Sequence, residues 1–106
     1  MPREDIYELS LAQIIEKLNH FLGWEFENDK IKKEFKFHDF LDALDFINKL
    51  AGFCEAKDHH PDMHIYYNKI VFELQRFDIG GKVTNMDFEV AAEIERLFKE
   101  FEIQKK

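Results

Sequence analysis

The chain has 106 residues, enough for one domain with a single core, and its 45% hydrophobic content, including twelve Phe, argues against disorder. Its 22 acidic residues outnumber 15 basic ones and give a formal charge of −7, so we expect no direct nucleic-acid binding. One cysteine, Cys54, excludes an internal disulfide, and no apolar run approaches the roughly 18 residues that would span a membrane. We therefore expect a soluble cytoplasmic domain, residues 1–106, that does not bind membranes.

Two kinds of local pattern open the chain. Apolar residues at helical spacing from Leu11 to Leu22 predict a first helix, with Ser10 as its N-cap and Gly23 at its end. The next segment, residues 24–37, alternates between apolar and polar side chains on either side of Asn28-Asp29, a pair typical of turns. This segment predicts a β-hairpin.

A second helix is predicted from Phe40, where apolar residues return to helical spacing. Asp39 is its expected N-cap. The helix should end near Asp58, because Pro61 cannot continue a helix and disfavours helical geometry in the residue before it.

Four residues inside this second helix carry further expectations. Cys54 lies on the apolar face, where a free cysteine behaves as a small buried hydrophobe. Gly52 suggests close packing against a neighbouring helix, since glycine otherwise costs about 1 kcal/mol in a helix relative to alanine. Phe46 and Phe53 lie outside the main apolar stripe and are candidates for contacts between subunits.

The last part of the chain predicts two strands, a turn and a helix. The strands fall within residues 65–77, the turn within 79–82 and the helix within 88–101, and Thr84 with Asp87 resembles a capping box. The order is thus helix, strand, strand, helix, strand, strand, helix. This order predicts an α+β fold, with an antiparallel sheet and helices on one of its faces.

Three histidines fall within six residues, where the second helix gives way to a strand. His59, His60 and His64 ionise near neutral pH and could therefore supply both an acid and a base. Imidazoles also bind metal ions, and Asp58 or Asp62 could add a ligand, but the spacing lacks the helical HExxH arrangement, so we expect no metal site. A third interpretation is that these histidines are surface residues at a helix C-terminus, where positive charge is favourable.

The chain carries the pattern Glu55-x-x-x-His59-His60-Pro61, followed by Tyr67 and Asp87. This pattern resembles the signature of the pterin-4a-carbinolamine dehydratases, also called dimerization cofactors of hepatocyte nuclear factor 1. The resemblance extends over about residues 11–98 and includes three further motifs: Gly23-Trp24, Phe35-x-Phe37-x-Asp39-Phe40 and Tyr67-Asn68-Lys69. It implies a four-stranded antiparallel sheet with three helices packed on one face.

The resemblance also implies an activity. Members of the family dehydrate 4a-hydroxytetrahydrobiopterin during tetrahydrobiopterin recycling, without a metal or an organic cofactor, and they assemble as homotetramers, each a dimer of dimers. By this resemblance, His59 and His60 carry out the acid and base steps, with neither step assigned to one of them, and Glu55 orients an imidazole. The implied pterin-binding residues are Glu55, Asp58, Pro61 and Phe77.

Position 77 departs from the family pattern, which has a further histidine, sometimes a tryptophan, ten residues after the tyrosine. Phe77 can stack on a pterin but cannot transfer a proton, and losing a group that acts directly in proton transfer costs about 10²–10⁴-fold in rate. The resemblance therefore implies weakened dehydration or, alternatively, a non-catalytic pterin-binding or dimerization protein on the same fold. His64 is a candidate replacement for the missing group.

Overall fold

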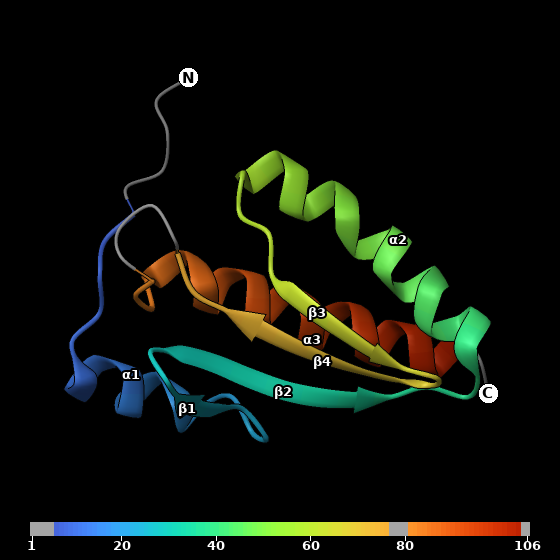
Figure 1. The fold of residues 1–106 in the computed structure, drawn as a ribbon, viewed down its shortest axis with the longest axis horizontal. Helices are drawn as coiled ribbons and strands as arrows, with labels where there is room; N and C mark the ends of the chain where they lie inside the picture. The colour runs from blue at the N-terminus through green and yellow to red at the C-terminus, as the bar shows by residue number, and fades with distance from the viewer. Residues whose placement is uncertain (1–5, 77–80, 105–106) are drawn as a thin grey trace.

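The computed structural model describes residues 6–76 and 81–104. Over these residues the chain forms three helices and four strands in the predicted order (Figure 1). The elements are α1 (Leu11–Leu18), β1 (Glu25–Glu27), β2 (Lys30–Lys36), α2 (Phe40–Lys57), β3 (Asp62–Tyr66), β4 (Lys69–Leu74) and α3 (Asn85–Gln104). The predicted α+β class is confirmed.

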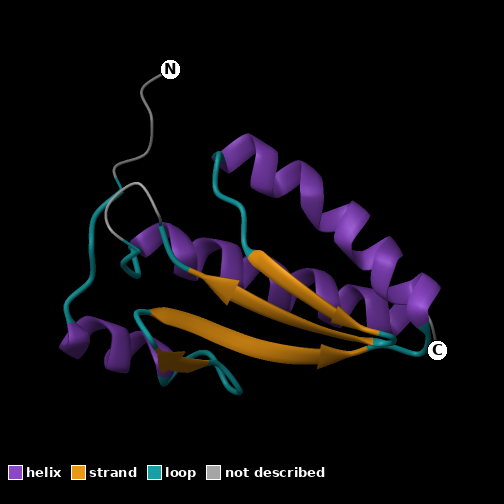
Figure 2. Cartoon of the chain, in the orientation of Figure 1, coloured by secondary structure: helices purple, strands orange, loops and turns teal. Residues whose placement is uncertain are grey.

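The four strands form one antiparallel sheet in the order β1-β2-β4-β3, which leaves β3 at one edge. The predicted hairpin joins β1 to β2 through Asn28 and Asp29, which both have left-handed backbone angles, with φ of 54° and 60°. Asn and Asp tolerate this geometry, and two-residue hairpin turns require it. Figure 2 shows the strands in orange, with α3 running behind β3 and β4.

One face of the sheet carries the core, and the other is charged. Along β4 the buried residues Ile70, Phe72 and Leu74 alternate with partly exposed ones, as the period of a strand requires. The helices contribute to the same core cluster, which confirms the prediction that they cover one face. On the other face Glu73 pairs with Lys30 at 2.6 Å.

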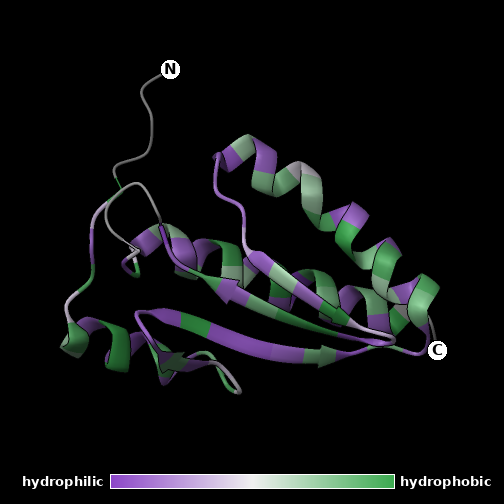
Figure 3. Ribbon diagram, viewed as in Figure 1, coloured by the Kyte–Doolittle hydropathy of each residue, from purple (hydrophilic) through white to green (hydrophobic). Residues whose placement is uncertain are grey.

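Phe46 lies at the centre of the core, so its expected role in contacts between subunits is wrong. Its ring is fully buried and packs against the rings of Phe37, Phe72, Phe98 and Phe101, with centroids 5.1–6.1 Å apart. The reason is that α2 packs against both β4 and α3, so more than one stripe of the helix is covered. Figure 3 shows apolar and polar segments alternating along α2. Phe53 also packs against the core.

The helix ends follow local chemistry. Ser10 and Gln13 form a capping box at α1, and Asp39 accepts a hydrogen bond from the Asp42 amide at α2, as predicted for both N-caps. The first helix ends at Leu18 rather than Leu22, because the following amides bond to carbonyls three residues back.

Two further observations concern the helices, the first of them a glycine inside α2. Gly52 is exposed, and, apart from its chain neighbours and the nearby backbone of α2, no heavy atom of the described residues lies within 4 Å of the position its Cβ would take, so the expected close packing is not found there. None of the helices within residues 6–76 and 81–104 has both the length and the apolar composition needed to cross a membrane.

Candidate active site

The two adjacent histidines lie at the corner between α2 and β3 and point to different environments. Asp58 ends α2 in the left-handed conformation, with φ 53° and ψ 44°, and the His59 amide then donates to the Cys54 carbonyl at 3.1 Å. A left-handed residue of this kind turns the chain sharply away from the helix axis. As a result His59 is buried, with 4% of its surface exposed, whereas His60 is exposed.

His59 is hydrogen-bonded through Nε2 to Oδ1 of Asp87, which is fully buried in the first turn of α3. The second carboxylate oxygen accepts the Thr84 amide at 2.7 Å and the Thr84 hydroxyl at 3.2 Å. This is the predicted contact between Thr84 and Asp87, although α3 begins at Asn85 rather than at Phe88. The N-terminus of a helix favours a negative charge, so α3 helps to keep a carboxylate at this buried position.

Arg76 completes the surroundings of the His59 ring. Its Nη1 atom lies 3.4 Å from Nδ1 of His59 and 3.1 Å from the backbone oxygen of Asp58. Arg76 follows β4 and is held by backbone hydrogen bonds to Lys82 and Gly81, at 2.9 and 3.0 Å. Sequence reasoning missed this residue, and the only available signal was its position next to Phe77.

His60 forms the second pair, with Glu55. Its Nε2 is hydrogen-bonded to Oε2 of Glu55, which lies five residues earlier in the last part of α2. Both side chains are open to solvent, with 54% and 76% of their surface exposed. Glu55 is therefore placed where it can orient the His60 imidazole, in a setting much wetter than that of His59.

Two residues near the motif, His64 and Tyr67, lie away from this corner. His64 lies on the charged face of the sheet, away from the helices, with Nε2 3.4 Å from Oε1 of Glu73. Tyr67 follows the far end of β3 and is exposed, with φ 56°, so its place in the motif fits a turn position. Pro61 is buried at the corner itself, and Phe77 lies outside the described residues.

The three histidines considered in the alternative metal interpretation lie beside different groups. His59, His60 and His64 each contact a different carboxylate, so they do not converge on one point. Within residues 6–76 and 81–104, the group of three potential ligand residues whose ligand atoms all lie within 4.8 Å of one another is His38, Asp39 and Asp42. Asp39 there accepts the Asp42 amide as the N-cap of α2, so the cluster has a structural explanation.

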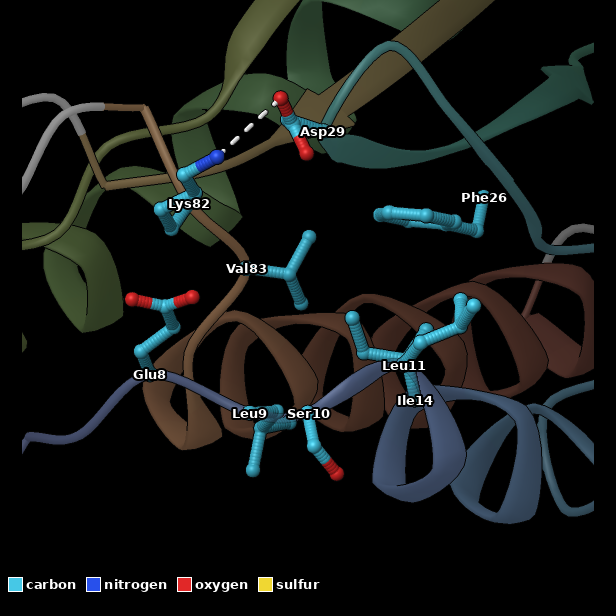
Figure 4. Close-up of a pocket in the computed structure, with 9 residues that line it drawn as sticks. All are labelled: Glu8, Leu9, Ser10, Leu11, Ile14, Phe26, Asp29, Lys82 and Val83. Carbon is cyan, nitrogen blue, oxygen red and sulfur yellow. Dashed lines mark hydrogen bonds and ion pairs between the residues drawn. The ribbon is translucent and has the colours of Figure 1, made fainter.

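A hollow of about 260 Å³ is lined by the segment around the start of α1, the hairpin turn and the residues just before α3 (Figure 4). Apolar side chains form much of its lining, among them Ile14, Phe26 and Val83, while Lys82 and Asp29 face each other at its rim. None of its lining residues belongs to the histidine corner. Its volume is below the roughly 300–1,000 Å³ typical of ligand pockets, and the two histidine–carboxylate pairs lie elsewhere.

Fold and site together define a small α+β protein with two imidazole–carboxylate pairs at one helix-to-strand corner. Residues 7–97 match the family model described as pterin 4 alpha carbinolamine dehydratase. The chain belongs to that family.

Individual relatives agree with this assignment. Proteins with the provisional name pterin-4-alpha-carbinolamine dehydratase include one from Sulfurisphaera tokodaii, 41% identical over 90 residues, which are 85% of this chain and 96% of the relative. Another, from Picosynechococcus sp., is 42% identical over 89 residues, or 84% and 96% of the two chains. The crystal structure of a transcriptional coactivator/pterin dehydratase from Brucella melitensis superimposes with a TM-score of 0.80 at 29% identity, covering 86% of this chain and 98% of that one.

Proposed function

We propose that this protein is a pterin-4a-carbinolamine dehydratase, a lyase that removes water from 4a-hydroxytetrahydrobiopterin during cofactor recycling. The observation that carries the proposal is the pair of histidines at one corner, each with its own carboxylate, in a chain of this family. Relatives named for the same dehydration support it.

The reaction needs one base and one acid. The base removes the proton on N5 of the pterin, the electron pair of that bond forms the C4a=N5 double bond, and the C4a–O bond breaks. The acid gives its proton to the departing hydroxyl, which leaves as water. Imidazoles suit both steps because their ordinary pKa lies near neutral pH, and we assign the two steps jointly to His59 and His60.

Four further residues are proposed to contact the pterin or to shape its site. Pro61 and the Asp58 backbone shape the corner, and Glu55 orients His60 by its hydrogen bond. Phe77 is proposed to stack on the pterin ring, since a phenyl group offers an apolar face and no proton. The reaction as proposed uses side chains of this protein for every proton transfer.

A dehydration assay on purified full-length protein tests the proposal. Compare wild type with His59→Ala, His60→Ala and the control His64→Ala, whose imidazole lies on the opposite face of the sheet. We expect wild type and the His64 variant to accelerate dehydration, and the other two to lose about 10²–10⁴-fold if each group transfers a proton directly. Equal rates for all four proteins at the uncatalysed level would refute the enzyme assignment.

A second candidate function is a non-catalytic pterin-binding or regulatory protein on the same fold. Two observations favour it: Phe77 stands where the family pattern has a further proton-transferring residue, and the Brucella protein is described as a transcriptional coactivator as well as a dehydratase. Fluorescence titration with a dihydropterin analogue, run beside the rate assay, separates the two functions. Binding without any acceleration supports the second function, whereas acceleration supports the first.

We also propose that residues 1–106 act as one cytoplasmic domain that assembles as a homotetramer, a dimer of dimers. Two exposed features support the assembly. All five residues of edge strand β3 are exposed, including Met63, Ile65 and Tyr66, and Leu41 presents an apolar side chain on α2. An exposed strand edge is open to pairing with another chain. Light scattering at the monomer mass of 12.8 kDa would refute the tetramer.

A further inference from the structure

Arg76 brings a permanent positive charge to the buried histidine. Its Nη1 atom lies 3.4 Å from Nδ1 of His59. A guanidinium has donors and no acceptor, and it stays protonated in proteins, so Nδ1 can only accept in this contact. Nδ1 must therefore be unprotonated for the contact to be favourable.

The opposite nitrogen of the same ring faces a negative charge. Nε2 is hydrogen-bonded to Oδ1 of Asp87, whose other oxygen already accepts two hydrogen bonds from Thr84. An ionised carboxylate is an acceptor only, so Nε2 must carry the hydrogen. The contacts with Arg76 and Asp87 are therefore both favourable in the same neutral tautomer of His59, in which Nε2 carries the hydrogen and Nδ1 does not.

The two neighbours have opposite effects on a second proton. A carboxylate on its own stabilises an imidazolium, whereas a guanidinium next to the ring destabilises it. We propose that Arg76 is a positioning residue, which keeps His59 neutral with Nδ1 unprotonated, although the carboxylate of Asp87 favours the imidazolium. Because His59 is buried, water screens these interactions less than at the surface.

Two other ionisable groups near this corner, Lys57 and Glu55 of α2, contact different partners. Lys57 of α2 pairs with Glu89 of α3 at 3.6 Å, which places one positive and one negative charge together. Glu55 of α2 is hydrogen-bonded to His60. The His59 ring itself contacts two charged side chains, Asp87 at Nε2 and Arg76 at Nδ1, and the proposal rests on these two contacts.

NMR of the full-length protein with ¹⁵N-labelled histidine tests the proposal, because the Nδ1 signal reports protonation directly. Three variants are compared with wild type across a pH series. Arg76→Gln removes the charge but keeps a donor, and Arg76→Lys keeps the charge. Lys82→Gln is the matched control, since Lys82 forms a β-bridge with Arg76 but pairs with Asp29.

We expect Arg76→Gln to raise the proton affinity of Nδ1 at least about tenfold, or one pH unit. Arg76→Lys should stay within about threefold of wild type, and Lys82→Gln should leave the titration unchanged. The proposal is overturned if Arg76→Gln titrates as wild type does, or if Lys82→Gln shifts the titration as much as Arg76→Gln.

A kinetic consequence rests on the proposed function. If the protein dehydrates the carbinolamine, the acid limb of kcat/KM should move to higher pH in Arg76→Gln by the same factor as the NMR titration. In Arg76→Lys the acid limb should return to its wild-type position. Absence of dehydration in every protein would refute the proposed function, while the NMR comparison would still decide the role of Arg76.

Discussion

The imidazole of His59 and the carboxylate of Asp87 are hydrogen-bonded in the protein interior, although 28 residues separate them in the chain. The bond links the corner after α2 to the first turn of α3. Because Asp87 also accepts the amide and hydroxyl of Thr84, one buried carboxylate organises both the start of α3 and the orientation of the ring.

Replacing this carboxylate should lower stability. Asparagine has one side-chain oxygen in place of the two acceptors of Asp87, so in Asp87→Asn either His59 or Thr84 loses its acceptor. Hydrogen bonds to buried charged groups contribute about 1.5–3 kcal/mol, so we expect a loss of about 2 kcal/mol in the free energy of unfolding, measured by urea titration. Asp62→Asn, at an exposed position, is the control. Equal stability of the two variants would contradict the role of Asp87.

The His60–Glu55 pair should matter for rate and little for stability. Both side chains are exposed, and exposed ion pairs contribute little, so His60→Gln and Glu55→Gln should change the free energy of unfolding by no more than about 0.5 kcal/mol. Dehydration should fall about 10²–10⁴-fold in His60→Gln and less in Glu55→Gln, which keeps the imidazole. Rates measured beside thermal unfolding check both statements, and a large loss of stability would contradict the first.

Restoring a histidine at position 77 should raise the rate. Phe77→His supplies a proton-transferring group at the position where the family pattern has one, and a direct contributor is worth about 10²–10⁴-fold. Phe77→Leu removes the ring without adding a titratable group and serves as the control. An unchanged dehydration rate in Phe77→His would show that position 77 does not limit catalysis.

Cys54 should react slowly while the protein is folded. Burial raises the pKa of its thiol from 9.0 to about 11, so at neutral pH the thiolate is about a hundredfold scarcer than in an exposed cysteine. Labelling with a disulfide reagent should be slow at pH 8, accelerate with pH up to about 11 and become fast in urea. Equal labelling rates for folded and unfolded protein would contradict this.

The same shift has a consequence for stability. The folded pKa is raised, so the neutral thiol's contribution is complete below the unfolded pKa and is lost as pH rises toward about 11. Urea titrations of wild type and Cys54→Ala at pH 8 and at higher pH would detect it. The difference in stability between the two proteins should narrow as pH rises.

Glycine 52 is a site for stabilisation. It lies in the exposed interior of α2 with open space at its Cβ position, so Gly52→Ala should stabilise the helix by about 1 kcal/mol. Gly23→Ala is the contrasting change, because φ of +88° and the Lys33 side chain 2.9 Å away make a Cβ unfavourable there. Urea titration measures the free energy of unfolding of both variants. A loss of stability in Gly52→Ala would instead indicate that another subunit packs against Gly52.

Much of the architecture follows from local patterns. Ser10 and Asp39 were recognisable as N-caps, and Asn28-Asp29 as a hairpin turn, because each depends on contacts between near neighbours in the chain. Helical and strand periodicities likewise predicted the type and order of the seven elements found in the described residues, and the burial of Cys54, although β3 begins at Asp62, three residues before the predicted 65–77. The predicted place of His59 and His60 at a helix-to-strand junction is also confirmed, since they lie between α2 and β3.

Other features depend on contacts between distant parts of the chain. The early end of α1 leads Trp24 into the core, where its Nε1 donates to Glu95 at 2.8 Å. Phe46 lies at the centre of the core because α2 packs against both the sheet and α3. This packing depends on the tertiary fold, and helical periodicity does not predict it.

By itself, then, the sequence determined the order of elements, their caps and the presence of a histidine pair, since propensity, periodicity and capping act over a few residues. Only the tertiary structure decided that His59 is buried between Asp87 and Arg76 while His60 stays in solvent with Glu55. That difference arises from one left-handed residue, Asp58, and from the packing of α3 and the end of β4 against the corner it creates.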